Sequence, residues 1–225
     1  PLQGRGNCHK KKPEAPRRLR AGEDVGEGCC NSKTLHNMAI HQTIPSLLKE
    51  SLSELIFVAD YCVNYKKENS PWPKEQIGGC LGFPASILLF SIVDAIGSYY
   101  REDKDFRITV DGDNKRIRND SFQHFYILNS DYYNKQDLSE GFIKKIYNNY
   151  RSLLIHNAVL PFDHFLEIGN PSDKPFEIKK NNGKDIPVVK MAPFLNISKK
   201  AIEKFIKNVD TLSESKQMKS IEKRK

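Results

Sequence analysis

An arginine and a histidine, Arg151 and His156, lie five positions apart in the segment of residues 147–157. At about 100° per residue, a regular helix places them roughly 140° apart, on flanking sides of one face, and the long arginine side chain can close that gap. A guanidinium group holds phosphate oxygens, and an imidazole transfers a proton near neutral pH. Together the two side chains suit the cleavage of a phosphodiester bond.

A second pair, Arg118 and His124, has a similar spacing in a different setting. Arg118 lies in a charged, turn-rich stretch, residues 101–120, which we interpret as an exposed connection in which nothing fixes its geometry. Arg151 lies instead on a predicted helix with a wide apolar face, shortly before that helix ends. We therefore rank Arg151 and His156 above Arg118 and His124.

Polar residues near the first pair are candidates for supporting roles. Asp94 interrupts an apolar helix, so its carboxylate needs a partner if it is buried, and Arg151 is the natural candidate. That ion pair would either orient the site or only neutralise a charge in the core. Amides can donate hydrogen bonds to a phosphate, although asparagine is equally ordinary at a helix end. The supporting residues that we expect are Asp94, Asn149, Ser152 and Asn157.

The elements that must position these residues are mostly helical. Apolar residues recur at spacings of three and four, which is typical of amphipathic helices. Asp137 and Glu140 form a capping box that opens the helix carrying Arg151 and His156, and Asn157 suits the C-terminal end of that helix. The helices that these patterns predict span residues 43–67, 84–100, 122–128, 137–157 and 198–212.

Two short strands are predicted between the last two helices. They flank Asn182-Gly183, a dipeptide typical of hairpin turns, and Pro187 argues for an edge position. Ser198 is then the expected N-cap of the last helix. The predicted fold class is mainly α, a helical bundle with a small β-hairpin at about residues 175–190, before the C-terminal helix.

The positive charge of the chain belongs to its ends. The 225 residues carry a formal net charge of +8, yet residues 1–34 hold eight Lys/Arg against four acids, and residues 199–225 hold nine against four. Attraction of phosphate to the body must therefore rest on local clusters of charge. We expect a disordered or expression-derived leader at 1–37, one helical domain at 38–212 and a basic tail at 213–225.

Membrane crossing, secretion and metal binding are not expected. The longest apolar run, residues 83–96, contains Asp94 and is shorter than the roughly 18 residues that span a bilayer. The N-terminus has no apolar stretch after its basic residues and so no secretory signal. The five cysteines lack the paired C-x-x-C spacing of zinc sites. We expect a cytoplasmic protein with no membrane contact, no metal and no cofactor.

The segment of residues 147–157, following the apolar helix at 83–100, resembles the HEPN superfamily of helical domains with their Arg-x4-6-His signature. The resemblance spans about residues 43–160. It implies a helical bundle that forms a homodimer, in which two Arg/His pairs meet in a groove. It also implies a metal-independent RNA endonuclease, in which the ribose 2′-hydroxyl of the substrate attacks the adjacent phosphate.

Carried to this chain, the resemblance makes His156 the acid and base and Arg151 the phosphate clamp. Ser152 departs from the residue that the family prefers after the arginine, and Asn119 of the second pair is nearer to it. The leading expectation is an RNA-directed HEPN-like protein. One alternative is a non-catalytic module that binds RNA or a partner protein in the same groove. The other is a structural homo-oligomer in which Arg151 and His156 only stabilise a helix end.

Overall fold

The computed structural model describes residues 43–68, 71–118 and 120–214. The leader predicted for residues 1–37 lies outside the described residues, as does the predicted basic tail from residue 215 onward. The α-helices are α1 (Ile44–Asn64), α2 (Gly82–Tyr99), α3 (Glu140–Lys145), α4 (Leu154–Asn157) and α5 (Met191–Asn208). The strands are β1 (Ile108–Val110), β2 (Asp113–Lys115), β3 (Phe165–Glu167), β4 (Phe176–Asn181) and β5 (Lys184–Lys190).

Several short helical segments connect these elements. Residues 146–153 form a π-helix, and the other segments are 3₁₀ turns. In chain order they are η2 (Lys74–Gln76), η3 (Ser121–Asn129), η4 (Asp131–Tyr133), η5 (Ile146–Leu153, the π-helix) and η6 (Thr211–Glu214).

The predicted fold class, a helical bundle with a single hairpin, is wrong. The structure is mixed, with 55% helix, 13% strand and two small sheets. The first sheet pairs β1 with β2 within the stretch that was expected to be an exposed connection. Asp111 and Gly112 turn between these strands with φ values of 54° and 81°, the backbone of a two-residue hairpin turn. Ile108 and Val110 are buried and anchor the hairpin to the core.

The second sheet has the strand order β3-β5-β4. Its antiparallel β4–β5 pair confirms the hairpin predicted at residues 175–190, and β3 adds a parallel strand. The edge position predicted for Pro187 is wrong, because β5 is the central strand. Pro187 pairs with Ile178 and directly precedes Val188, where the β3 pairing begins, so its missing N–H interrupts no hydrogen bond to β3.

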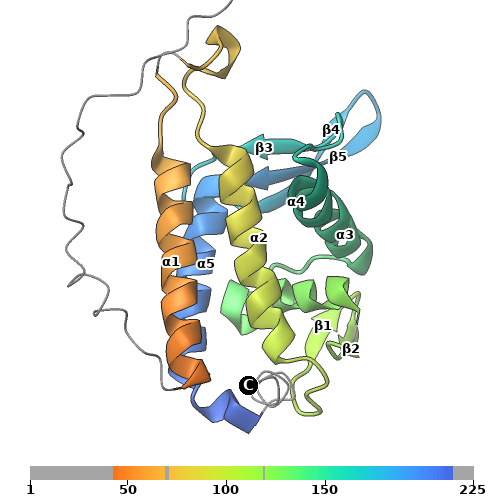
Figure 1. The fold of residues 1–225 in the computed structure, drawn as a ribbon. Helices are drawn as coiled ribbons and strands as arrows, with labels where there is room; N and C mark the ends of the chain where they lie inside the picture. Colours follow the sequence, from red (N-terminus) through yellow and green to blue (C-terminus); the bar gives the residue numbers. More distant parts are fainter. Residues whose placement is uncertain (1–42, 69–70, 119, 215–225) are drawn as a thin grey trace, which may run out of the picture. The chain divides into compact units, whose positions relative to one another are not determined.

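The core forms around α2, which contacts α1, α5 and η3 (Figure 1). An aromatic cluster centred on Phe90 of α2 joins five elements. Among the described residues, α2 is the one helix long and apolar enough to cross a membrane, and 56% of it is buried within the fold, as in a core helix. The residues around Phe90 are Phe125, Tyr150, Phe176 and Phe194.

The helix predicted at residues 137–157 differs in its start and in its regularity. Asp137 has a φ of 54°, a left-handed conformation that cannot serve as an N-cap, so the predicted capping box is wrong. Ser139 caps α3 instead, because its hydroxyl accepts a hydrogen bond from the backbone N–H of Phe142 at 3.2 Å. The middle of the predicted helix is the π-helix η5, and Ala158, with a φ of 54°, ends α4.

The last helix begins earlier than predicted. Ser198 was expected to cap it, but α5 already begins at Met191, and Ser198 is buried in the middle of the helix. Pro193 lies in the first turn of α5, where a proline removes no helical hydrogen bond. The early start lets α5 follow β5 directly, with no loop between the strand and the helix.

Candidate functional site

Asp94 of α2 joins two side chains from other elements. Its Oδ2 lies 2.7 Å from Nη2 of Arg151 on η5, and its Oδ1 lies 2.7 Å from Nδ1 of His124 on η3. Because a carboxylate only accepts hydrogen bonds, both nitrogens donate to Asp94. The side chains of Asp94, Arg151 and His124 are 19%, 26% and 11% exposed, so all three are largely buried. The ion pair predicted between Asp94 and Arg151 is therefore confirmed.

His124 was ranked below His156 because Arg118, its partner by spacing, lies in a turn-rich stretch that was expected to leave its geometry unfixed. In the structure His124 lies with Asp94 and Arg151, and no hydrogen bond joins it to Arg118 in the described part of the chain. Its Nε2 is buried without a protein partner. The buried Nε2 cannot contact a ligand in this conformation, and the side-chain contact that His124 makes is its hydrogen bond to Asp94.

Gly97 explains how His124 comes so close to α2. It lies three residues after Asp94, on the same face of the helix. A Cβ at position 97 would lie only 2.1 Å from the carbonyl oxygen of His124 and 2.7 Å from its carbonyl carbon. The absence of a side chain at Gly97 thus lets the backbone of η3 pack directly on α2 and presents the His124 ring to Asp94.

Arg151 is held by two contacts and keeps one terminal nitrogen for a ligand. Nη2 donates to Asp94, and the guanidinium lies 5.6 Å from the centre of the Tyr147 ring, a cation–π distance. Nε is buried without a partner. Nη1 has no hydrogen bond or ion pair to any described residue. A phosphate at this position could therefore be bound through Nη1.

His156 lies on α4, where its side chain is exposed. Within the described residues it makes no hydrogen bond or ion pair, and none joins it to Arg151. Because a π-helix has more residues per turn than an α-helix, each residue of η5 turns by less than 100°. The angular offset between Arg151 and His156 is therefore smaller than the roughly 140° of a regular helix. Such π-segments are rare and are frequent at functional sites.

The expected supporting residues differ in their contacts. The amide nitrogen of Asn149 lies 2.6 Å from Nε2 of His164, whose Nδ1 lies 2.8 Å from a carboxylate oxygen of Asp163. Nδ1 donates its hydrogen bond to the Asp163 carboxylate, so Nε2 is the acceptor and the Asn149 amide donates to it. This hydrogen bond between His164 and Asp163 lowers the pKa of Asp163. Ser152 and Asn157 make no side-chain hydrogen bond to any described residue, and Asn157 is exposed.

A second candidate region lies between the β1–β2 hairpin and η3, and sequence reasoning did not single it out. It is a cavity of about 580 Å³ that we call the basic pocket. Four of its lining residues are cationic and one is acidic. This local excess of positive charge does not show in the net charge of the chain body, which is close to zero. The lining residues are Arg107, Asn114, Lys115, Arg116, Arg118, Gln123, Tyr126 and Glu140.

Glu140 is the acid of the basic pocket. It pairs with Lys115 and, at 3.1 Å, with Lys144. The hydrogen bonds to Lys115 and then to Lys144 lower the pKa of Glu140. Burial, with a smaller contribution from Glu140, raises the pKa of Tyr126 to about 12. The negative charge in this pocket is therefore already compensated by lysines.

These ion pairs make the stability of the fold depend on pH. A carboxylate whose pKa is lowered in the folded state stabilises the fold above its ordinary value of about 4.3, and this contribution is lost as the pH falls through the lowered value. Glu140→Gln should therefore reduce the free energy of unfolding near neutral pH, by no more than about 1 kcal/mol, because water still reaches and screens this partly exposed pair. Urea unfolding of both chains at several pH values measures the difference.

The difference between the wild-type chain and Glu140→Gln should shrink toward zero as the pH falls below about 4. Asp113→Asn on the neighbouring strand is the control, because Asp113 makes no ion pair with a described residue. A penalty for Glu140→Gln that stays constant down to the lowest pH would show that the lysine pairs do not cause it.

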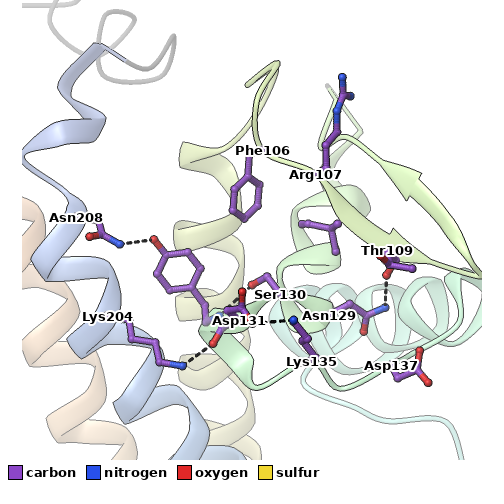
Figure 2. A pocket seen from close by; sticks show the side chains of 12 residues that line it. Phe106, Arg107, Thr109, Asn129, Ser130, Asp131, Lys135, Asp137, Lys204 and Asn208 are labelled. Atoms are coloured by element: carbon purple, nitrogen blue, oxygen red, sulfur yellow. Dashed lines mark hydrogen bonds and ion pairs between the residues drawn. The ribbon is translucent and has the colours of Figure 1, made fainter.

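A neighbouring cavity of about 660 Å³ shares Arg107 with the basic pocket (Figure 2). Its other polar groups bind each other: Lys135 pairs with Asp131 at 3.1 Å, and Lys204 donates to the Asp131 carbonyl at 2.5 Å. Asn208 donates to the Tyr132 hydroxyl at 3.1 Å. Figure 2 shows the Arg107 side chain pointing away from this cluster. The larger cavity therefore has few free donors for a ligand.

No group of three or more His, Cys, Asp or Glu side chains is placed to hold a metal ion in the described part of the chain. The resemblance to the HEPN superfamily rests on the segment around Arg151 and His156 and stays a prediction. Searches of protein-family models, curated proteins and solved structures find no match to this chain.

Proposed function

We propose that the chain acts on RNA as a metal-independent endoribonuclease, with Arg151 and His156 at one site of a homodimer. One observation carries the proposal. An arginine held by Asp94 and Tyr147 lies one helical turn before a histidine that is exposed and without a described partner. The first side chain is positioned and the second is free to exchange protons with a ligand.

Arg151 would act through its charge and geometry. With Nη2 held by Asp94, Nη1 can donate to a non-bridging phosphate oxygen. A guanidinium that is already fixed loses little conformational entropy when a phosphate binds, because its rotamer is set before the substrate arrives. Arg151 therefore stabilises the negative charge that builds up on the phosphate during the reaction.

His156 would move the protons of the reaction. Its neutral imidazole takes the proton of a ribose 2′-hydroxyl, whose oxygen then attacks the adjacent phosphorus. The bond from phosphorus to the 5′ oxygen breaks as the 2′,3′-cyclic phosphate forms. The partner's His156, in its protonated form, gives a proton to the departing 5′ oxygen. The nucleophile belongs to the RNA, so DNA is not a substrate.

Exposed apolar side chains next to His156 support a homodimer. Ile155, Val159 and Phe162 are 39%, 52% and 106% exposed, and they immediately flank or follow the motif. Apolar patches of this kind mark surfaces that bind another molecule. A second copy of the chain packed on this patch would bring the two His156 residues toward one groove.

One observation favours a second candidate, a non-catalytic module that binds RNA or a partner protein at the same site. Asp94 compensates the charge of Arg151 and occupies one of its two terminal nitrogens. This reduces the electrostatic stabilisation that Arg151 can give to a phosphate, while a hydrogen bond through Nη1 remains available. Such a site would hold an RNA segment without cutting it.

Two substitutions test the roles of the pair in the full chain. His156→Ala should lower the rate of RNA cleavage by at least about 100-fold, because it removes the acid and base. Arg151→Lys keeps the charge beside Asp94 but loses the forked guanidinium, and should lower the rate about tenfold or more. Circular dichroism checks that both variants stay folded, and Lys145→Ala, an exposed cation on α3, is the control.

The outcomes separate the two candidates. An unchanged cleavage rate in His156→Ala contradicts the catalytic role of that residue. RNA binding without cleavage by the unsubstituted chain, weakened by Arg151→Lys, supports the non-catalytic module instead.

A further inference from the structure

We propose that the basic pocket binds the diphosphate group of a small phosphorylated ligand, at a site distinct from Arg151 and His156. The cationic groups that carry this inference are Arg107, Arg116 and Arg118. All three side chains are exposed, and none of their guanidinium groups makes an ion pair or hydrogen bond with a described residue. The fourth cation, Lys115, is already paired with Glu140.

The hairpin register brings two of these arginines together. Ile108 pairs with Lys115 at the open end of the β1–β2 ladder, so Arg107 and Arg116 are the next opposing positions. Opposing residues of an antiparallel pair have Cβ atoms about 4.5–5.5 Å apart, and like charges in such positions repel each other. An anion bound between Arg107 and Arg116 would attract both guanidinium groups, and this attraction would offset the repulsion between them.

Arg118 joins the same pocket from the segment that leads to η3. Ile117 is buried with 1% exposure, and its two neighbours, Arg116 and Arg118, are both exposed and line the cavity. The backbone N–H of Arg118 donates to Gln123 of η3 at 2.8 Å, which ties this segment to the core. The three arginines thus lie on anchored backbone: Arg107 is next to the buried strand β1, and Arg116 and Arg118 flank buried Ile117 in the segment after β2.

The number of free charges favours a diphosphate over a single phosphodiester. Each guanidinium can bind phosphate oxygens through two parallel hydrogen bonds, and three of them match a group with two or three closely spaced negative charges. Asp111 and Asp113 on the hairpin turn reduce the surrounding potential, but neither lines the pocket. The volume of about 580 Å³ falls within the range of small-molecule sites.

Calorimetric titration of the full chain with inorganic pyrophosphate tests the proposal. We expect saturable one-to-one binding, at least about tenfold tighter than that of inorganic phosphate, because the second phosphate engages a further arginine. The double variant Arg116→Gln/Arg118→Gln should weaken pyrophosphate binding at least about tenfold without changing the melting temperature. The matched control is Lys180→Gln/Lys200→Gln, which removes the same charge from exposed positions outside the pocket.

Three results would overturn the proposal. They are the absence of saturable binding, an equal loss of affinity in the control variant, and competition in which short single-stranded RNA displaces pyrophosphate. The last result would assign the arginines to an RNA backbone. The endoribonuclease proposal is tested separately, because the variant Arg116→Gln/Arg118→Gln keeps Arg151 and His156, so its RNA cleavage should equal that of the unsubstituted chain.

Discussion

Asp94→Ala should lower the free energy of unfolding by about 3 kcal/mol, because it leaves the Arg151 guanidinium largely buried without its counter-charge and the His124 ring without its hydrogen-bond acceptor. For a domain of this size, that corresponds to a fall in melting temperature of about 6–12 °C. The loss reflects the cost of an uncompensated buried charge rather than the strength of the two hydrogen bonds alone. Chemical denaturation followed by circular dichroism measures it.

An exposed ion pair provides the control for Asp94→Ala. Asp131 pairs with Lys135 at 3.1 Å, and these side chains are 86% and 69% exposed, so Asp131→Ala should cost no more than about 0.5 kcal/mol. Equal effects of Asp94→Ala and Asp131→Ala would show that water screens Asp94 as well. The three-residue cluster would then have no special role in fixing Arg151.

Gly97→Ala should destabilise the fold by about 2–3 kcal/mol, although alanine is ordinarily the better helix former. The new Cβ would meet the backbone of His124 at 2.1 Å, and backbone cannot move aside as the end of a flexible side chain can. Segment η3 must shift away from α2, which also lengthens the hydrogen bond from His124 to Asp94. Urea unfolding gives the change in stability.

Gly141→Ala is the matched control for Gly97→Ala. Gly141 also lies in a helix, but a Cβ there meets no atom within 4 Å. This substitution should stabilise the chain by up to about 1 kcal/mol, through helix propensity and a less flexible unfolded state. If Gly97→Ala also raised the stability, the close packing of η3 on α2 would not be a feature of the folded protein.

The helical core could be predicted from the sequence because its apolar residues repeat over long stretches. Residues 84–100 were expected as a helix and form α2 at Gly82–Tyr99, and residues 43–67 form α1 at Ile44–Asn64. The Asn-Gly turn likewise marks the β4–β5 hairpin. In these segments, local periodicity and burial agree, so a short window of sequence contains the needed information.

The β1–β2 hairpin could not be predicted with the same ease, because its strands are three residues long and surrounded by charged residues. The dipeptide Asp111-Gly112 is typical of a two-residue hairpin turn, but it lies within the charged stretch of residues 101–120 that was interpreted as an exposed connection. Apolar periodicity at residues 137–157 likewise predicts a regular helix. It cannot distinguish an α-helix from the π-helix η5, because both keep one apolar face.

The candidate site was predictable in part. A buried carboxylate needs a partner of opposite charge, and this rule correctly predicted the ion pair between Asp94 and Arg151, which lie far apart in the sequence. The contribution of His124 depends on the close contact of η3 with Gly97, a tertiary feature that spacing along the chain does not encode. The basic pocket depends in the same way on the hairpin register that places Arg107 beside Arg116.

The proposed function is tested most directly by the chemical structure of the 3′ ends of the RNA fragments that the full chain produces in the presence of EDTA. A single-stranded RNA and its 2′-deoxy counterpart are incubated with the chain, and the products are identified by mass spectrometry. We predict that the RNA is cut to fragments ending in 2′,3′-cyclic phosphate and that the deoxy strand stays intact. An intact RNA, or equal cleavage of the deoxy strand, would contradict the proposal that His156 activates the 2′-hydroxyl.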